Sequence, residues 1–331
     1  MTLIFLLVAV FLKSTVGGQS NADFLETGTD FPVPGDSKYH DWFHRAKPVC
    51  GTRAYDHTSR NGRLENIPHD KSLVNRIVGG NGARPDEIPW QASVKLVGDN
   101  GQFMHWCGAA IISEYWLLSA AHCFHGRLNR KWWIIVGESH LHREDAWEQM
   151  FEVDTIYMHE HYNDTSFDYD FALIKIKPSA SYRAIRFNSY AQPVCLPDST
   201  MSLTLGAKLV VSGWGLIKPC EYCQTTPNEN SEFLRKAVVP YIGQSYCKLF
   251  YPQSITDRMF CAGYTKGGID SCHGDSGGPV VYKTRGSWVL YGIVSWGEGC
   301  AQPYKPGVYG RVSSVLSWIS SITWRNSLNS L

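Results

Sequence analysis

Residues 268–281 read GIDSCHGDSGGPVV and place one serine, Ser276, among glycines and acidic residues. A serine hydroxyl becomes an effective nucleophile only when a base accepts its proton and nearby donors stabilise the oxyanion that forms. Small neighbours would let a substrate carbonyl approach the backbone N–H groups of Gly274 and Ser276. An ordinary glycine-rich loop is the other interpretation of this stretch, so the choice depends on a base and a residue that orients it.

Two further stretches supply candidates for these roles. LLSAAHCF (117–124) places His122 at the end of an apolar strand, and FDYDFALIKI (167–176) places Asp170 at the start of another. A carboxylate so placed can hold an imidazole in the tautomer that accepts a proton from serine. Taken singly, a buried histidine and an aspartate in a turn are the ordinary interpretations.

Together and in this order, SAAHC, DYDFALIKI and GDSGGP resemble the trypsin-like serine proteases of the chymotrypsin fold, and RIVGG (76–80) fits the same family. The resemblance extends from Arg76 to the C-terminus. It implies that His122 is the general base and then acid, that Asp170 orients it, and that Ser276 attacks the substrate to form an acyl-enzyme. Gly274 and Ser276 would form the oxyanion hole.

The residues after Arg76 form short β-branched and aromatic runs separated by Gly, Pro and Asn, which predicts an all-β fold. The resemblance implies two antiparallel six-stranded β-barrels, the first over roughly 77–195 and the second over roughly 196–331, with the active site between them. SSVLSWISSI (313–322) alone has helical spacing and predicts a C-terminal helix.

Composition is consistent with a globular chain: 331 residues, 44% hydrophobic, 18% charged and a formal net charge of +1. Nucleic acids and anionic membranes are bound through concentrated basic surfaces, so these partners are not expected. Residues 1–18 contain an apolar run from Leu3 to Leu12 and predict a signal peptide, hence a secreted, extracellular protein. A membrane anchor is the alternative, but the run is short of the ~20 residues needed to span, and no transmembrane segment is expected.

Residues 19–76 are polar, without sustained periodicity, and are interpreted as a pro-segment or tether. The resemblance implies that cleavage after Arg76 frees the amino group of Ile77 to pair with Asp275, because a buried carboxylate needs a partner. The full-length chain would therefore be a zymogen; an activating protease is the expected partner, and self-activation is the alternative. As a simple turn residue, Asp275 would leave RIVGG unexplained.

The resemblance also implies the substrate class. Asp270 matches the floor of the primary specificity pocket, where a carboxylate pairs with a substrate Lys or Arg, and Gly297 and Gly307 match its walls. Ser295 matches the serine that supports the catalytic aspartate, and we assign it with Trp296 to the substrate-binding residues. We expect protein or peptide substrates cleaved after Arg or Lys, and protein protease inhibitors as further partners.

Ten cysteines in an exported chain indicate disulfide bonds. The resemblance implies the pairs Cys107–Cys123, Cys247–Cys261 and Cys272–Cys300, together with Cys50–Cys195, which would keep the pro-segment attached after activation. Cys220 and Cys223 in KPCEYCQ remain. A local disulfide is our interpretation; free or intermolecular thiols and half of a zinc site are the alternatives.

Two further features concern ions and modification. Glu138, Asp145 and Glu148 resemble the calcium-binding loop of trypsins, and clustered hard oxygen ligands suit Ca²⁺. A solvated charged loop is the alternative, and no cofactor is required for the proposed chemistry. Asn163-Asp164-Thr165 is a sequon for N-glycosylation, although such triplets also arise by chance.

The sequence thus predicts a secreted serine endopeptidase zymogen with trypsin-like specificity. The alternative is a non-catalytic binding protein on the same fold, because fold does not fix function. Such a protein would be expected to have lost His122, Asp170 or Ser276, and this chain has all three.

Overall fold

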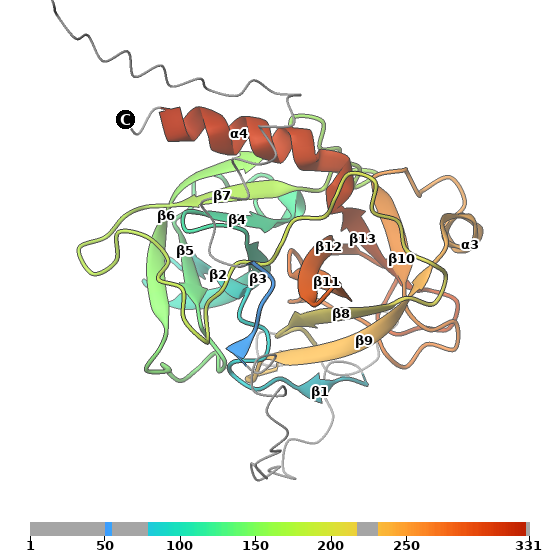
Figure 1. Ribbon diagram of the computed structural model, residues 1–331, viewed down its shortest axis with the longest axis horizontal. Coiled ribbons are helices and arrows are strands. Elements are labelled where there is room, and N and C mark those ends of the chain that lie inside the picture. Colours follow the sequence, from blue (N-terminus) through green and yellow to red (C-terminus); the bar gives the residue numbers. More distant parts are fainter. Residues whose placement is uncertain (1–49, 55–78, 217–230, 329–331) are drawn as a thin grey trace, which may run out of the picture. The chain divides into compact units, whose positions relative to one another are not determined.

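The computed structural model describes residues 50–54, 79–216 and 231–328 (Figure 1). Every described residue belongs to one compact unit, residues 48–331. The predicted signal peptide, most of the pro-segment, Arg76, Ile77, Cys220 and Cys223 lie outside the described residues.

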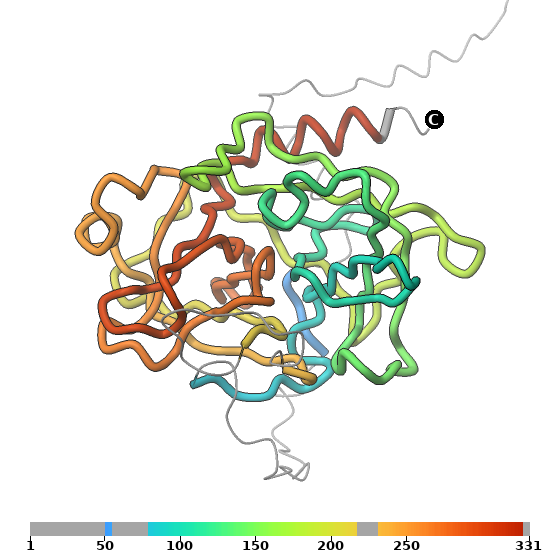
Figure 2. The backbone as a smooth tube through the Cα atoms, turned by 180° about the vertical axis from the view of Figure 1, so that it is seen from behind, coloured from blue at the N-terminus to red at the C-terminus, as the bar shows by residue number. Residues whose placement is uncertain are grey.

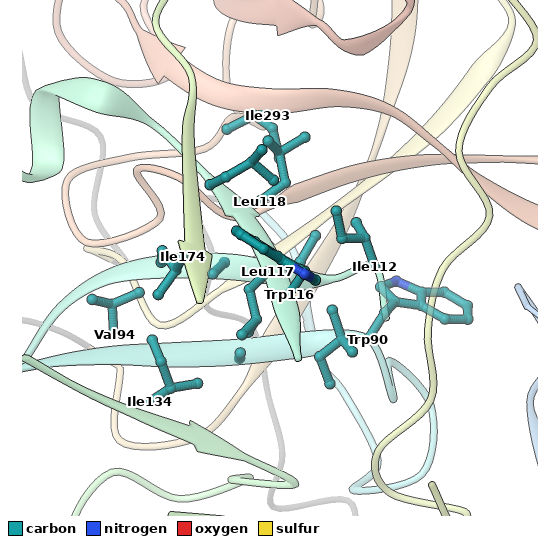
Figure 3. Packing of buried hydrophobic residues seen from close by; sticks show 14 of the residues in the cluster. Trp90, Val94, Ile112, Trp116, Leu117, Leu118, Ile134, Ile174 and Ile293 are labelled. Carbon is teal, nitrogen blue, oxygen red and sulfur yellow. The ribbon is translucent and has the colours of Figure 1, made fainter. Parts of the chain in front are cut away.

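Six antiparallel strands close the first barrel in the order β2-β3-β4-β7-β6-β5. They are β2 (Gln91–Val97), β3 (Phe103–Ile111), β4 (Trp116–Ser119), β5 (Trp132–Val136), β6 (Gln149–Met158) and β7 (Ala172–Ile176). Side chains that point inward from opposite strands meet in the centre: Figure 3 shows Val94, Leu117, Ile134 and Ile174 gathered there, all of them fully buried. Burial inside a closed sheet explains the apolar runs of the sequence.

The second barrel contains β8 (Lys208–Gly213), β9 (Arg235–Ile242), β10 (Met259–Ala262), β11 (Pro279–Thr284), β12 (Ser287–Trp296) and β13 (Gly307–Arg311). These strands follow the order β9-β10-β13-β12-β11-β8, and pairing of β8 with β9 closes the ring. The short strand β1 (Asn81–Gly82) pairs with β9. The strand that directly follows RIVGG thus adds to the second barrel, although it precedes every strand of the first barrel in the sequence.

The two predicted barrels are confirmed, and so is the C-terminal helix. A 3₁₀ turn at Val312–Val315 leads into α4 (Leu316–Leu328), which Figure 1 shows along the edge of the molecule. One other α-helix is described, α3 (Gln244–Phe250), which precedes β10. No helix in the described ranges is long and apolar enough to cross a membrane.

The barrels meet through close backbone contacts. The N–H of Gly108 on β3 donates to the carbonyl of Ser276 at 2.7 Å. A Cβ atom on Gly108 would lie 2.8 Å from Cα of Gly278, so only glycine permits this approach. Figure 2 shows the two barrels from behind, the first in cyan to green and the second in yellow to red. The segment that carries Ser276 is therefore fixed against the first barrel.

Four disulfides join described cysteines, and they are the pairs that the family resemblance implied: Cys50–Cys195, Cys107–Cys123, Cys247–Cys261 and Cys272–Cys300. The first pair attaches residues 50–54 to the barrels. There, Gly51 exchanges backbone hydrogen bonds with Pro193 and Trp288, and the guanidinium of Arg53 lies 4.5 Å from the Trp288 ring centre.

Candidate active site

His122 and Asp170 meet because their strands pair. His122 lies in the 3₁₀ turn Ala121–Cys123 that follows β4, and Asp170 lies two residues before β7. Ser119 at the end of β4 is paired with Ala172 at the start of β7, which brings the two flanking segments together. The Nδ1 atom of His122 lies 2.8 Å from Oδ2 of Asp170, and the backbone N–H of His122 donates to Oδ1 at 2.9 Å.

A third donor to this carboxylate comes from the other barrel. The hydroxyl of Ser295, near the end of β12, donates to Oδ2 of Asp170 at 2.6 Å. Burial by itself would lower the pKa of His122. The negative charge of Asp170 and its hydrogen bond outweigh that effect and raise the pKa above its ordinary value. The arrangement suits an imidazole that accepts a proton and is stabilised as imidazolium.

Ser276 lies next to the end of β4. Gly277 has φ +75°, and a Cβ there would lie 2.2 Å from Oγ of Ser119, three residues before His122. The structure forms no hydrogen bond between Ser276 Oγ and His122 Nε2. Catalytic hydrogen bonds are often long in the absence of substrate and tighten when it binds.

The backbone of Gly274 is fixed by a histidine that the sequence analysis did not single out. Nε2 of His105 lies 2.9 Å from the carbonyl oxygen of Gly274, and Nδ1 lies 2.8 Å from the hydroxyl of Ser93. Burial lowers the pKa of His105 to about 4, so the ring is neutral at neutral pH. No local pattern sets His105 apart, because the register of β3 with β2 shifts between His105 and Cys107 and interrupts the alternation.

Asp275 is fully buried immediately before the serine. Its Oδ1 accepts from the N–H of Gly215 at 2.7 Å, and its Oδ2 accepts from the N–H of Cys272 at 2.9 Å. Burial raises its pKa to about 6, although these backbone hydrogen bonds act in the opposite direction. The carboxylate is thus poised to gain from a nearby cation.

Asp270 is the second buried acid of this segment. Its Oδ2 accepts from the N–H of Ala301 at 3.1 Å, whereas its Oδ1 has no hydrogen-bond partner among the described residues. A Cβ on Gly307 would lie 2.8 Å from this Oδ1. Burial raises the pKa of Asp270 to about 7. An oxygen of this kind, reached past a glycine, can receive a cationic group.

The other predicted pocket residues lie nearby in sequence and structure. Trp296 ends β12 and is half-buried, and its ring lies 5.0 Å from that of Tyr251. Gly297 is exposed, and a Cβ there would meet only the carbonyl of Gly299, at 3.6 Å. Gly297 therefore has open space beside it, whereas Gly307 is closely packed against Asp270 and Tyr309.

The three acidic residues of the predicted calcium loop are brought together, and Lys95 of β2 lies among them. Lys95 Nζ is 2.6 Å from Oε1 of Glu138. Asp145 accepts from the N–H of Ser139 at 3.1 Å, and Glu148 accepts from the N–H of Asp145 at 3.0 Å. Sequence analysis missed Lys95, because nothing in the pattern of β2 sets this lysine apart.

Asn163 and the two cysteines beside His122 bear on glycosylation and on metal binding. Asn163 is exposed, and its side-chain oxygen accepts from the backbone N–H groups of Thr165 and Ser166. His122 lies beside Cys107 and Cys123, a combination that can bind metal elsewhere. Here the two sulfur atoms are bonded to each other, so they supply no thiolate ligands.

A double β-barrel with an aspartate, a histidine and a serine at the junction defines the class of chymotrypsin-like serine hydrolases. Comparison with known proteins agrees. The family model described as Trypsin matches residues 77–319. The chain belongs to the trypsin family of serine proteases.

The chain is similar to several curated relatives. It is 42% identical to transmembrane protease serine 9 of Rattus norvegicus over 250 residues, which cover 75% of this chain and 22% of the relative. It is 40% identical to transmembrane protease serine 7 of Mus musculus, covering 75% of this chain and 28% of the relative. It is 39% identical to trypsin-3 of Salmo salar, and the match covers 74% of this chain and 92% of the relative. The chain therefore spans less than a third of the length of the first two relatives.

Proposed function

We propose that this protein is a serine endopeptidase whose nucleophile is Ser276. The observation that carries the proposal is the hydrogen-bonded chain from Ser295 through Asp170 to His122, beside a serine on a glycine-rich turn. Ser276 Oγ attacks the substrate carbonyl while His122 Nε2 takes its proton, and the same proton then passes to the leaving amine. Water hydrolyses the acyl-enzyme in the reverse sequence.

The N–H groups of Gly274 and Ser276 donate to the oxyanion of each tetrahedral intermediate. One such donor is worth roughly 3 to 4 kcal/mol in a comparable enzyme. His105 keeps the Gly274 carbonyl turned away from this position by hydrogen-bonding it.

The pocket at Asp270 favours substrates with Arg or Lys before the scissile bond. The support is its buried, unpartnered carboxylate oxygen, whose desolvation a substrate cation would offset. Glycine at positions 297 and 307 leaves room for a long side chain. An uncharged side chain would leave the carboxylate without a counter-ion and would bind poorly.

Activation follows from the environment of Asp275. This carboxylate is fully buried with backbone donors but no cation among the described residues. Cleavage after Arg76 by an activating protease would supply the ammonium of Ile77, and pairing with Asp275 would order the adjoining Gly274 and Ser276. We therefore propose that the full-length chain is a zymogen, with Cys50–Cys195 retaining the pro-segment.

We also propose that the protein is exported, with residues 1–18 as signal peptide, 19–76 as pro-segment and 77–331 as the peptidase domain. Four disulfides among the described residues suit an oxidising compartment. Its partners are protein or peptide substrates and protein inhibitors that occupy the same cleft, and Asn163 is exposed to receive a glycan.

The test uses full-length protein treated with a trace of trypsin that is then removed. Matched peptides that differ only in Arg, Lys, Phe or Ala before the scissile bond are assayed. We expect cleavage after Arg and Lys only, and only when sequencing finds the Ile77 terminus. In the Ser276→Ala variant, processed identically, kcat should fall on the order of 10⁶-fold.

The outcomes separate the parts of the proposal. Equal activity before and after release of Ile77 would contradict the zymogen, and cleavage after Phe would contradict the role of Asp270. A correctly processed protein that cuts no peptide would instead favour a binding protein on this fold. Activity in the Ser276→Ala preparation measures residual trypsin and serves as the control.

A further inference from the structure

The loop between β5 and β6, residues 137–148, contains the three carboxylates that resemble a calcium site. We call it the acidic loop. Ca²⁺ in proteins takes six to eight oxygen ligands at about 2.3–2.6 Å. Whether this loop can supply them depends on what its carboxylates already bind, and each of the three has partners within the protein.

Glu138 is bound to an ammonium group. Oε1 of Glu138 lies 2.6 Å from Nζ of Lys95, and the two side chains are 3% and 4% exposed. Lys95 reaches the loop from the neighbouring strand β2, which pairs directly with β5. A buried ion pair so close to the loop's first carboxylate places a full positive charge where a divalent cation would be held.

The other two carboxylates are engaged by donors of the loop itself. Oδ2 of Asp145 accepts from both the N–H and the hydroxyl of Ser139, and its Oδ1 accepts from Arg143 at 3.4 Å. Oε1 of Glu148 accepts from the N–H of Asp145. A calcium ion would have to replace these donors and would also be repelled by Lys95.

One atom favours a cation. Oε2 of Glu138 is buried and has no hydrogen-bond partner among the described residues. An oxygen of this kind is costly unless positive charge lies close by, and Lys95 on the same carboxylate supplies that charge. If the ammonium were removed, this oxygen would become the natural first ligand of an added ion.

We propose that the Lys95 ammonium takes the place of a divalent cation in the acidic loop, so that the loop is ordered without calcium. Removal of this ammonium converts the loop into a calcium-binding site formed by Glu138, Asp145 and Glu148. The residues present therefore do not fit a resident calcium ion, and the family resemblance at these three positions misleads unless Lys95 is counted.

The acidic loop also contacts the second barrel. The N–H of Leu141 donates to the carbonyl of Glu232 at 2.8 Å, and the N–H of Leu234 donates to the carbonyl of Ser139 at 2.8 Å. Residues 232 and 234 directly precede β9. An internal cation thus keeps this contact between the barrels independent of the calcium concentration around the protein.

The experiment measures the thermal unfolding midpoint of the full-length protein with EGTA and with millimolar CaCl₂. For the wild-type protein we expect the same midpoint in both. For Lys95→Gln we expect a lower midpoint in EGTA and a rise of roughly 5 °C on adding calcium, as ligand linkage predicts for a site well above saturation. Terbium luminescence sensitised by Trp147, within the loop, should appear with Lys95→Gln alone.

Lys177→Gln is the matched control, because Lys177 also pairs with a glutamate of the first barrel, Glu152, but at the surface. It should respond to calcium no more than the wild-type protein does.

The double variant Lys95→Gln, Glu138→Gln removes both charges and guards against a folding defect in the single variant; it should fold and lose the calcium response. A calcium-dependent rise in the wild-type midpoint, or none in Lys95→Gln, would overturn the proposal. These readouts do not depend on peptidase activity, so the proposed function is tested separately.

Discussion

At the scale of single residues, the geometry depends on how the carboxylate of Asp170 is held. Two donors come from His122, and the third comes from Ser295, which lies 125 positions after Asp170 in the chain. The carboxylate is buried, so each donor stabilises its charge in a medium of low dielectric constant. Its orientation is thereby fixed before substrate arrives.

Substitution of Ser295 tests this arrangement. In Ser295→Ala, Asp170 loses one charge-assisted hydrogen bond, and we expect kcat/KM of the activated enzyme to fall about tenfold. The less stabilised carboxylate attracts the imidazolium more strongly, so the already raised pKa of His122 should rise further. The acid limb of the pH profile of kcat/KM should then move to higher pH.

Ser212→Ala is the control for this prediction, because Ser212 is also buried at the junction but bonds Gln91 rather than Asp170. Its acid limb should stay where the wild-type limb lies. If Ser295→Ala leaves the limb in place as well, the serine does not act through the carboxylate.

At the scale of elements, the loop 163–169 before Asp170 is held against the second barrel. Phe167 and Tyr169 have φ of 56° and 54°, a conformation that costs energy for residues other than glycine. Between them, Asp168 accepts from the hydroxyl of Thr256 at 2.7 Å and from Nε of Arg258 at 3.1 Å. Burial would raise the pKa of Asp168, but these two partners lower it overall.

This contact positions Phe167 beside His122. The ring of Phe167 lies 5.8 Å from that of His122, edge to face. When Arg258 is replaced by alanine, the strained loop loses its support and Phe167 loses its place. We expect a rise in KM for peptide substrates and a fall in kcat/KM of about tenfold, in line with the loss of one partly buried ion pair.

Lys248→Ala removes a neighbouring but exposed ion pair with Asp257 and should leave both constants unchanged. Arg258→Lys should restore part of the lost kcat/KM, because a charge without the planar guanidinium satisfies Asp168 incompletely. Equal kinetics for Arg258→Ala and Lys248→Ala would show that the ion pair does not position the loop.

At the scale of the whole molecule, two buried acids oppose folding at neutral pH. Burial raises the pKa of Asp270 to about 7 and that of Asp275 to about 6, from an ordinary value of 3.8. At pH values between 3.8 and the raised pKa of each group, the folded chain holds a proton that the unfolded chain has lost. The contribution of these two groups to the free energy of unfolding therefore falls as pH rises, by about 1.4 kcal/mol per pH unit for each group.

The contribution of Asp275 to this pH dependence should depend on cleavage after Arg76. Urea unfolding at pH 4.5 and pH 7 is measured on the Ser276→Ala protein, which cannot digest itself. We expect the uncleaved form to lose stability between the two pH values and the cleaved form to lose less, because the Ile77 ammonium lowers the pKa of Asp275. Asp275→Asn should flatten the decline in the uncleaved form. An identical decline with and without Asp275 would contradict this account.

Much of the candidate site could be predicted from the sequence because its motifs are local and chemically constrained. The glycines around Ser276 are needed for close backbone approach, as the contact of Gly108 with Gly278 shows. The apolar runs that flank His122 and Asp170 predict strands, and the family order of the motifs implied the barrels that the structure contains. Short-range patterns and spacing carry this information.

By itself, the sequence determined the β-rich fold, and it predicted the catalytic serine, histidine and aspartate and the acids that could serve a pocket or a new N-terminus. Only the tertiary structure decided which distant groups meet: Lys95 and the acidic loop, His105 and the carbonyl of Gly274, Arg258 and Asp168, and β1 and the second barrel. These contacts join residues that are distant in sequence, and closing two barrels against each other brings them together. No local pattern marks Lys95, because a lysine at this strand position would equally well be a surface charge.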